Sequence, residues 1–175
     1  MKIKNILIIG LGSIAKKHLK ILKKTNQNIR IFKLKNKNKN KSLNYINRLI
    51  INYKLKSALI CSPADTHLNY INFLKKKKIN YLVEKPIIKD NQLKLFNRTY
   101  DKKLSITELV GYQLRYSKIL SKVKKILLLK TIGKIYSVKI FVNSYLPNWR
   151  KANLKKSLSL SKKLGGGVLL ELSHE

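Results

Sequence analysis

The residues with the clearest chemical potential are a lysine and a pair of glycines, each placed where a short apolar run ends. The turn Gly10-Leu11-Gly12-Ser13-Ile14-Ala15 closes the first apolar run, and Glu84-Lys85-Pro86 follows the run Asn80-Tyr81-Leu82-Val83. A lysine ammonium held beside an alcohol that is becoming a carbonyl stabilises the developing alkoxide. A glycine-rich turn between a strand and a helix is typical of a nucleotide site. Together the two segments predict redox chemistry on a hydroxyl group next to a bound nucleotide.

The glycine turn has a physical reason for each of its small residues. Gly10 permits the tight turn out of the strand, Gly12 lets the backbone approach a pyrophosphate, and Ala15 lets the helix pack closely on the sheet. The amides of the helix that begins at Ser13 then face the phosphates. We expect the cofactor to be bound by Gly10, Gly12, Ser13, Ile14 and Ala15. The alternative, an ordinary turn without a ligand, is disfavoured because the strand before it and the helix after it are both predicted.

The ribose end of the predicted nucleotide site lacks its usual acidic residue. In dinucleotide-binding folds this acid binds the ribose 2′-hydroxyl, but Phe32-Lys33-Leu34-Lys35 stands at the corresponding place. Lys33 could accept a 2′-phosphate, so NADP is an alternative to NAD. Because lysine is abundant throughout the chain, the choice between NAD and NADP stays open.

Alternating apolar runs and helical periodicity predict the elements that hold these residues. We expect strands over residues 6–9, 29–32, 58–61, 79–84 and 106–113. We expect helices over residues 13–24, 43–50, 66–76, 90–100 and 117–130. Asp90 is the predicted N-cap of the fourth helix, and the lysine- and asparagine-rich run 35–41 is a predicted loop. This order implies an α/β fold with a doubly wound parallel sheet that helices cover on both faces.

The pattern changes in the last third of the chain. Residues 135–145 alternate between apolar and polar side chains, which predicts a long amphipathic strand. The change of period near Gly133 indicates that the chain has entered a second domain. We assign residues 1–118 to a nucleotide-binding domain and residues 119–175 to the start of a second, incomplete domain.

The strong positive charge raises a different class of partner. The chain has 40 lysine and arginine residues and 7 acidic residues, which gives a formal charge of +33. Such a balance commonly indicates nucleic acid or an anionic membrane. Lysines are spread through every predicted element, however, whereas nucleic-acid surfaces favour the bidentate fork of arginine. We therefore interpret the charge as solvated surface and keep a polyanion-binding protein as an alternative function.

The sequence favours a cytoplasmic location. Lysine or asparagine interrupts every apolar stretch before it reaches about 18 residues, so no membrane span is expected. The first apolar run leads into Gly-x-Gly without a small-residue cleavage site, so it indicates a strand and not a secretion signal. The single cysteine, Cys61, cannot form an internal disulfide, which agrees with a reducing compartment.

Five motifs in a fixed order give the chain a resemblance to a known family. They are the glycine turn with His18, Ser62-Pro63-Ala64-Asp65-Thr66-His67, Glu84-Lys85-Pro86, Gly111-Tyr112-Gln113-Leu114-Arg115-Tyr116, and the segment 165–174. In this order they resemble the Gfo/Idh/MocA oxidoreductases. The resemblance implies a Rossmann domain, then an α+β domain with a mostly antiparallel sheet, and NAD- or NADP-dependent chemistry on sugars, inositols or nucleotide sugars. Residues 146–150 and 170–175 resemble members associated with cell-surface polysaccharide biosynthesis.

The resemblance also implies roles for individual residues. Lys85 would contact both the nicotinamide and the reacting hydroxyl, and His174 would be the general base that accepts the hydroxyl proton. The cofactor site would further include Ser62, Pro63, His67, Glu84, Lys85 and Gln113. The substrate would contact Lys85, Arg115, Trp149, Glu171 and His174, without a metal. For His67 a second interpretation stays open, that of a polar residue at a helix N-terminus without a role in the site.

Two departures from the family pattern bear on these roles. The family usually has an aspartate four residues before its catalytic histidine, whereas Glu171 precedes His174 by three, so whether His174 or Glu175 faces the substrate stays open. Family members also continue well beyond this histidine. We therefore expect the chain to be a fragment or a truncated product of a protein that is a homo-oligomer at full length. A catalytically inactive dinucleotide-binding module stays as an alternative function.

Overall fold

The computed structural model describes residues 3–25, 28–35, 38–99 and 105–142. These residues belong to two compact units, of which the first extends to Gly111 and the second begins at Tyr112. This boundary lies a few residues before the domain division predicted at residue 118.

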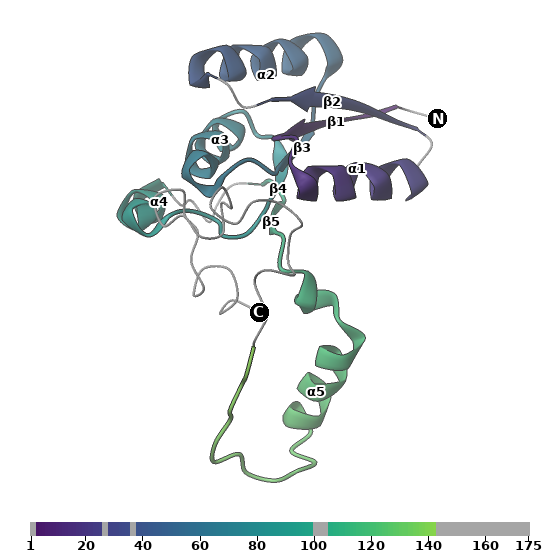
Figure 1. Cartoon of the computed structure of the whole chain (residues 1–175), viewed down its shortest axis with the longest axis vertical. Helices are drawn as coiled ribbons and strands as arrows, with labels where there is room; N and C mark the ends of the chain where they lie inside the picture. Colours follow the sequence, from purple (N-terminus) through teal and green to yellow (C-terminus); the bar gives the residue numbers. More distant parts are fainter. Residues whose placement is uncertain (1–2, 26–27, 36–37, 100–104, 143–175) are drawn as a thin grey trace, which may run out of the picture. The chain divides into compact units, whose positions relative to one another are not determined.

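The first unit alternates strands and helices along the chain (Figure 1). The strands are β1 (Lys4–Ile9), β2 (Ile29–Leu34), β3 (Ser57–Ile60), β4 (Asn80–Val83) and β5 (Glu108–Val110). The helices are α1 (Ser13–Thr25), α2 (Lys39–Tyr53), α3 (Ala64–Lys76) and α4 (Leu93–Thr99), with the 3-10 turn η1 (Asp90–Gln92) before α4. The strands form one sheet in the order β2-β1-β3-β4-β5, and every neighbouring pair is parallel. The predicted doubly wound α/β fold is confirmed.

Two separate cores lie on the two faces of this sheet. Successive residues of a strand point to opposite faces. Leu7 and Ile9 of β1 therefore join the larger core, to which α2 and α3 contribute. Ile8 joins the smaller core with Ala15 of α1. Helix α1 thus covers one face of the sheet while α2 and α3 cover the other (Figure 1), as right-handed crossovers require.

Two helices begin differently from the sequence prediction. The run 35–41 is predicted as a loop, but α2 begins at Lys39. The side chain of Asn38 accepts a hydrogen bond from the amide of Lys41 (3.3 Å) and so caps the helix inside the polar run. The prediction of Asp90 as an N-cap is wrong, because Asp90 lies within the 3-10 turn η1 that precedes α4.

The described part of the second unit is a 3-10 turn followed by one helix. The turn is η2 (Gln113–Tyr116), and the helix is α5 (Lys118–Leu128). The side chain of Ser117 caps α5 by accepting a hydrogen bond from the amide of Leu120 (3.5 Å). None of the described residues of this unit is buried. Within the part of the chain that the structure describes, no helix combines the length and the apolar character that a membrane crossing requires.

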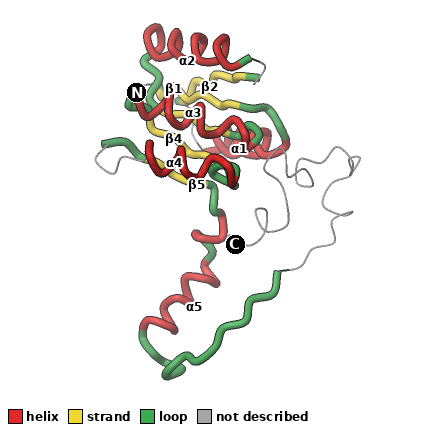
Figure 2. The backbone as a smooth tube through the Cα atoms, turned by 90° about the vertical axis from the view of Figure 1, so that its left-hand side faces the viewer, coloured by secondary structure: helices red, strands yellow, loops and turns green. Residues whose placement is uncertain are grey.

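The strand predicted over residues 135–145 is wrong for the residues that the structure describes. Residues 135–142 form no strand, and Figure 2 draws them as loop, while residues 143–145 lie outside the described residues. A strand is stable only when its backbone groups pair with a neighbour. No strand in the described ranges pairs with this segment, so its alternating pattern does not produce a strand here.

Candidate functional site

Loops that follow β1, β3 and β4 meet at the carboxyl edge of the sheet, which is where open α/β sheets bind their ligands. The glycine turn follows β1, Ser62 follows β3, and Glu84 with Lys85 follows β4. Backbone hydrogen bonds hold the start of the glycine turn, because the amide of Gly10 donates to the carbonyl of Leu34 at 2.9 Å. Three of the predicted site motifs therefore lie at one edge of the first unit.

The two glycines of the turn are glycines for different reasons. Gly10 has a φ of +87°, and a Cβ at this position would lie 2.6 Å from backbone atoms of Cys61 and Ser62. The fold itself therefore requires glycine at position 10. At Gly12, by contrast, a Cβ would meet nothing within 4 Å among the described residues. The fold leaves the space at Gly12 open, as a closely approaching ligand needs.

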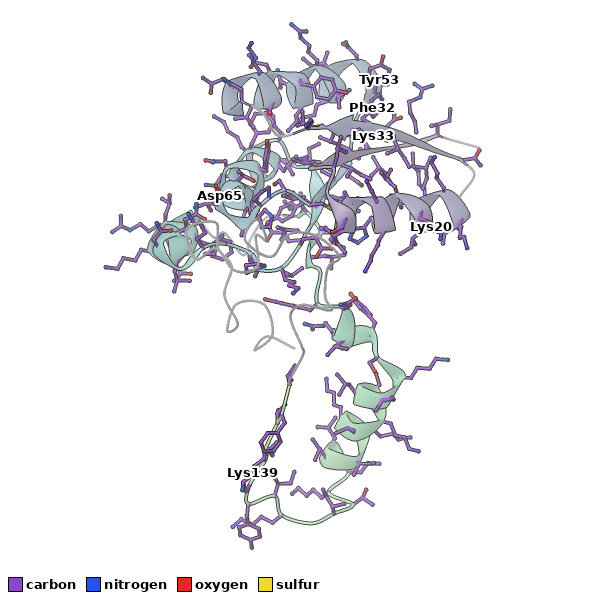
Figure 3. The ribbon with its side chains drawn as sticks, in the orientation of Figure 1. Lys20, Phe32, Lys33, Tyr53, Asp65 and Lys139 are labelled. Carbon is purple, nitrogen blue, oxygen red and sulfur yellow. The ribbon has the colours of Figure 1, made fainter. Side chains whose placement is uncertain are left out.

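The next predicted cofactor residues lie on α1 and β2. The first turn of α1 consists of Ser13, Ile14 and Ala15, and Ala15 is buried in the smaller core. Phe32 packs against Tyr53 of α2, with ring centroids 4.8 Å apart (Figure 3). The next residue, Lys33, therefore points to the other face, which α1 covers, and it is exposed. Its predicted contact with a 2′-phosphate stays a prediction.

Glu84 turns its carboxylate toward α1. The Nε2 atom of His18 lies 2.6 Å from Oε1 of Glu84, and the two side chains are 23% and 12% exposed. A Cβ at Gly111 would lie 3.0 Å from the other carboxylate oxygen, so a larger residue there would press on Glu84. His18 was not among the predicted site residues. The signal for it in the sequence is a polar residue on the inward, otherwise apolar side of α1.

His67 connects the loop after β3 with the loop that carries Lys85. Its Nε2 atom lies 2.7 Å from the carbonyl oxygen of Ser62, and its Nδ1 atom lies 3.0 and 3.1 Å from the carbonyl oxygens of Pro86 and Ile87. The ring is only 1% exposed. The structure thus buries His67 beside the site, where it contacts backbone atoms of both loops.

Burial is the largest influence on the pKa of His67. Burial lowers the pKa of this imidazole, although the carbonyl oxygens of Ser62, Pro86 and Ile87 and the carboxylate of Glu84 act in the opposite direction. A neutral ring carries one N–H group, so it donates to the carbonyl oxygens on one of its two sides. The contribution of His67 to a cofactor site would therefore be made through the two loops that it connects. The peptide bond between Lys85 and Pro86, in the second of these loops, is cis.

Ser62 and Pro63 are tied to the start of α3. The hydroxyl of Thr66 donates to the carbonyl oxygen of Pro63 (2.8 Å), so Ser62 donates the hydrogen bond between the Ser62 and Thr66 hydroxyls (2.7 Å). Ser62 is buried and Pro63 is half-buried. These bonds give the loop after β3 a defined shape beside the glycine turn.

Cys61 lies between these groups but is not a candidate nucleophile. Burial raises the pKa of its thiol to about 12, and the charge of Glu84 adds to this effect. A thiol with so high a pKa is protonated at neutral pH, whereas the thiolate is the reactive form. Cys61 therefore packs in the smaller core and takes no part in the proposed chemistry of the site.

The remaining predicted site residues belong to the second unit or lie outside the described residues. Gln113 and Arg115 lie in η2 of the second unit, where both side chains are exposed. Trp149, Glu171 and His174 lie outside the described residues. Their roles stay predictions.

A family model matches the part of the chain that forms this site. Residues 4–98 match the model named GFO_IDH_MocA, described as an oxidoreductase family with an NAD-binding Rossmann fold. By sequence, no curated protein matches the chain.

Solved structures of two dehydrogenases and of an NAD-binding protein resemble this chain over three quarters of its length or more. The scyllo-inositol dehydrogenase from Lactobacillus casei, solved with NAD(H) and scyllo-inositol, gives a TM-score of 0.60 at 16% identity over 75% of this chain and 43% of that chain. The myo-inositol 2-dehydrogenase from Lactobacillus plantarum gives 0.61 at 19% identity over 77% and 43%. An NAD-binding protein from Listeria innocua gives 0.64 at 17% identity over 99% and 51%. The chain thus spans less than half the length of the two inositol dehydrogenases, and at these identities the likeness shows the fold alone.

Proposed function

Because the chain belongs to the Gfo/Idh/MocA family of NAD-binding oxidoreductases, we propose that its carboxyl edge binds NAD or NADP for hydride transfer between the nicotinamide and the carbon that bears a secondary hydroxyl group. Family membership agrees with the resemblance seen in the five motifs and with the predicted class of cofactor. The proposed reaction is that of a sugar dehydrogenase, to which this chain supplies the cofactor half.

The observation that carries this proposal is the difference between Gly10 and Gly12. The fold accounts for Gly10 through its positive φ and its contact with the backbone of Cys61 and Ser62. It does not account for Gly12, where a side chain would find open space. A pyrophosphate that approaches the backbone at the start of α1 would use this space and the amides of the first helical turn. The described residues therefore fit a dinucleotide at this edge.

The chemistry proposed for Lys85 follows from its place after β4. A bound nicotinamide ring would accept or donate the hydride. The half-buried Lys85 would hold the reacting hydroxyl oxygen, and its ammonium would stabilise the negative charge that develops there. His174, proposed from the sequence alone, would take the hydroxyl proton. Lys85 would thus orient the alcohol while His174 provides the base.

We propose a sugar, a nucleotide sugar or a related cyclic polyol as the substrate. Support comes from the two similar structures that are inositol dehydrogenases, one of them solved with scyllo-inositol. The motifs at residues 146–150 and 170–175 favour a role in cell-surface polysaccharide biosynthesis. A cytoplasmic location and a homo-oligomeric state of the full-length protein complete the proposal.

The open space at Gly12 provides the test of cofactor binding. In titrations followed by NADH fluorescence, we expect Gly12→Val to weaken binding by at least about tenfold, since the new side chain would occupy the pyrophosphate space. Its free energy of unfolding should change by less than about 1 kcal/mol, because a Cβ at this position would meet no described atom within 4 Å beyond its chain neighbours. The control Gly10→Ala should instead destabilise the fold by at least about 1–3 kcal/mol. Unchanged NADH affinity in Gly12→Val would contradict the proposed site.

Turnover separates an enzyme from a binding module. If inositols or sugars reduce NAD in the presence of the chain, the dehydrogenase interpretation is supported. If NADH binds and Gly12→Val prevents this binding, yet none of these alcohols is oxidised, the chain is a dinucleotide-binding module instead.

A further inference from the structure

We propose that His18 is a positioning residue for Lys85 and that it acts through the carboxylate of Glu84. Neither the sequence motifs nor the family description assigns this role. The inference rests on the proposed function, because the direction of Lys85 matters only if a cofactor and an alcohol meet beside it.

The carboxylate of Glu84 is held by α1 on one side and by the end of β5 on the other. A carboxylate can only accept hydrogen bonds, so the Nε2 atom of His18 donates to Oε1 across 2.6 Å. Gly111 approaches the carboxylate so closely that a Cβ there would lie 3.0 to 3.2 Å from its atoms. With side chains 23% and 12% exposed, the pair is also partly shielded from water. Hydrogen bonds to an ionised group in such a place are stronger than exposed ones.

Lys85 lies between two points that are both fixed. On its N-terminal side, Glu84 is held by its side chain and by its amide, which donates to the carbonyl oxygen of Ile60 at 2.9 Å. On its C-terminal side, the carbonyl oxygens of Pro86 and Ile87 contact His67. Fixing Glu84 therefore defines the direction in which the backbone enters Lys85. Without the bond to His18, the Glu84 carboxylate would lose its attachment to α1, while the amide bond to Ile60 and the close approach of Gly111 would remain.

His18 also connects the lysine with the glycine turn. It lies on α1, the helix whose first turn follows Gly12. Its inward neighbours on α1, such as Leu19 and Leu22, are apolar and pack against the smaller core. A polar group among such neighbours is unfavourable unless a partner satisfies it, and Glu84 is that partner. The pair thus ties the helix proposed to bind phosphate to the loop proposed to hold the alcohol.

The amine of Lys85 can report directly on its own position. We would expose the protein to a trace amount of an acetylating reagent and measure by mass spectrometry the rate at Lys85 relative to Lys20. Lys20 is an exposed lysine on α1 that points away from the sheet (Figure 3). In His18→Leu we expect this ratio to rise about fivefold, the size that corresponds to the loss of one net hydrogen bond.

Two further variants distinguish positioning from general stability. His18→Gln should keep the ratio near the wild-type value, because the amide of glutamine can place a donor close to the position of Nε2. Leu22→Ala weakens the packing of the same helix but keeps both His18 and Glu84, so it should also leave the ratio unchanged. An unchanged ratio in His18→Leu, or an equal rise in Leu22→Ala, would overturn the proposal.

Titration with NADH separates this inference from the proposed function. We expect His18→Leu to bind NADH but to lose most of the protection that bound NADH gives Lys85 against acetylation, while His18→Gln retains it. If NADH binds and protects Lys85 equally in wild type and His18→Leu, the positioning role is wrong although the cofactor site stands. If NADH fails to bind the wild-type chain, the proposed function fails, and the ratios without cofactor decide on His18 alone.

Discussion

Glu84 and Glu108 lie at the ends of two neighbouring strands, on opposite edges of the same sheet. Glu84 follows β4 at the carboxyl edge and accepts a hydrogen bond from His18. Glu108 begins β5 at the amino edge, where its Oε1 atom lies 3.2 Å from Nζ of Lys75 and accepts a hydrogen bond from the hydroxyl of Tyr81 (2.6 Å). Both carboxylates have well-placed partners. The difference lies in what surrounds them.

The direction of the helices explains this difference. Helices in this fold run opposite to the strands, so α3 begins beside the site with His67 and ends at the amino edge with Lys75. The partners of Glu108 therefore come from the larger core, and Lys75 is only 7% exposed. At the carboxyl edge, by contrast, the glycine turn leaves open space at Gly12. The comparison favours a stabilising role for the amino edge and agrees with the function that we propose for the carboxyl edge.

The largest expected effect comes from removing the amine at the carboxyl edge. We expect Lys85→Ala to lower turnover by about 10² to 10⁴, because the group that orients and stabilises the alcohol oxygen is lost. The Kd for NADH should change little, since the pyrophosphate contacts proposed at the glycine turn remain. Steady-state kinetics and NADH fluorescence measure the two quantities. Lys89→Ala in the same loop is the matched control, and normal turnover in Lys85→Ala would contradict the catalytic role.

The second-largest expected effect is a loss of stability caused by a substitution at the amino edge. We expect Glu108→Ala to lower the free energy of unfolding by about 3 kcal/mol, because it removes a carboxylate from beside a buried ammonium. Glu108→Gln should lower it less, since its side chain can still accept the hydrogen bond from Tyr81. Urea unfolding measures both variants. Binding of NADH should be unchanged in each variant. A weakened affinity for NADH in folded Glu108→Gln would contradict the interpretation that only the carboxyl edge takes part in cofactor binding.

The sequence predicts the carboxyl edge better than the amino edge, because the signals at the carboxyl edge are local. The turn at Gly10 and Gly12 and the lysine after a strand can be read within a few residues. The pair of His18 and Glu84 joins residues 66 positions apart, so only the folded sheet brings them together. Glu108 carries no local signal at all, since its partners come from α3 and β4.

Two of the three errors in the elements, at residues 35–41 and 135–142, arise because the sequence pattern does not contain the deciding contact. The apolar runs of strands β1 to β4 favour burial by their composition alone. All four strands were therefore predicted near their observed positions. The polar run 35–41 conceals a helix start, because the capping bond of Asn38 depends on geometry and not on hydrophobicity. The segment 135–142 has the pattern of a strand, but pattern alone supplies no pairing partner among the described residues.

The smallest expected effect is a pH dependence of stability that arises from His67. It tests whether a neutral side chain connects the two loops at the carboxyl edge, in contrast to the charged pair at the amino edge. Burial lowers the pKa of His67 below its ordinary value of 6.5. Over the interval between the folded pKa and 6.5, the unfolded chain therefore binds more protons than the folded chain. We expect the free energy of unfolding contributed by this residue to be fully present above 6.5 and to be lost as the pH falls toward the folded pKa.

Urea unfolding of wild type and His67→Gln from neutral pH to about pH 5 measures this contribution. Glutamine can donate to a carbonyl oxygen but does not titrate, so wild type should lose stability relative to the variant as the pH falls. The same substitution at His18, the other described histidine near Glu84, shows whether the slope belongs to His67. If wild type instead gains stability relative to His67→Gln at lower pH, then three carbonyl oxygens and Glu84 outweigh burial. His67 would then be a cation that donates from both nitrogens, and both edges of the sheet would depend on buried charge.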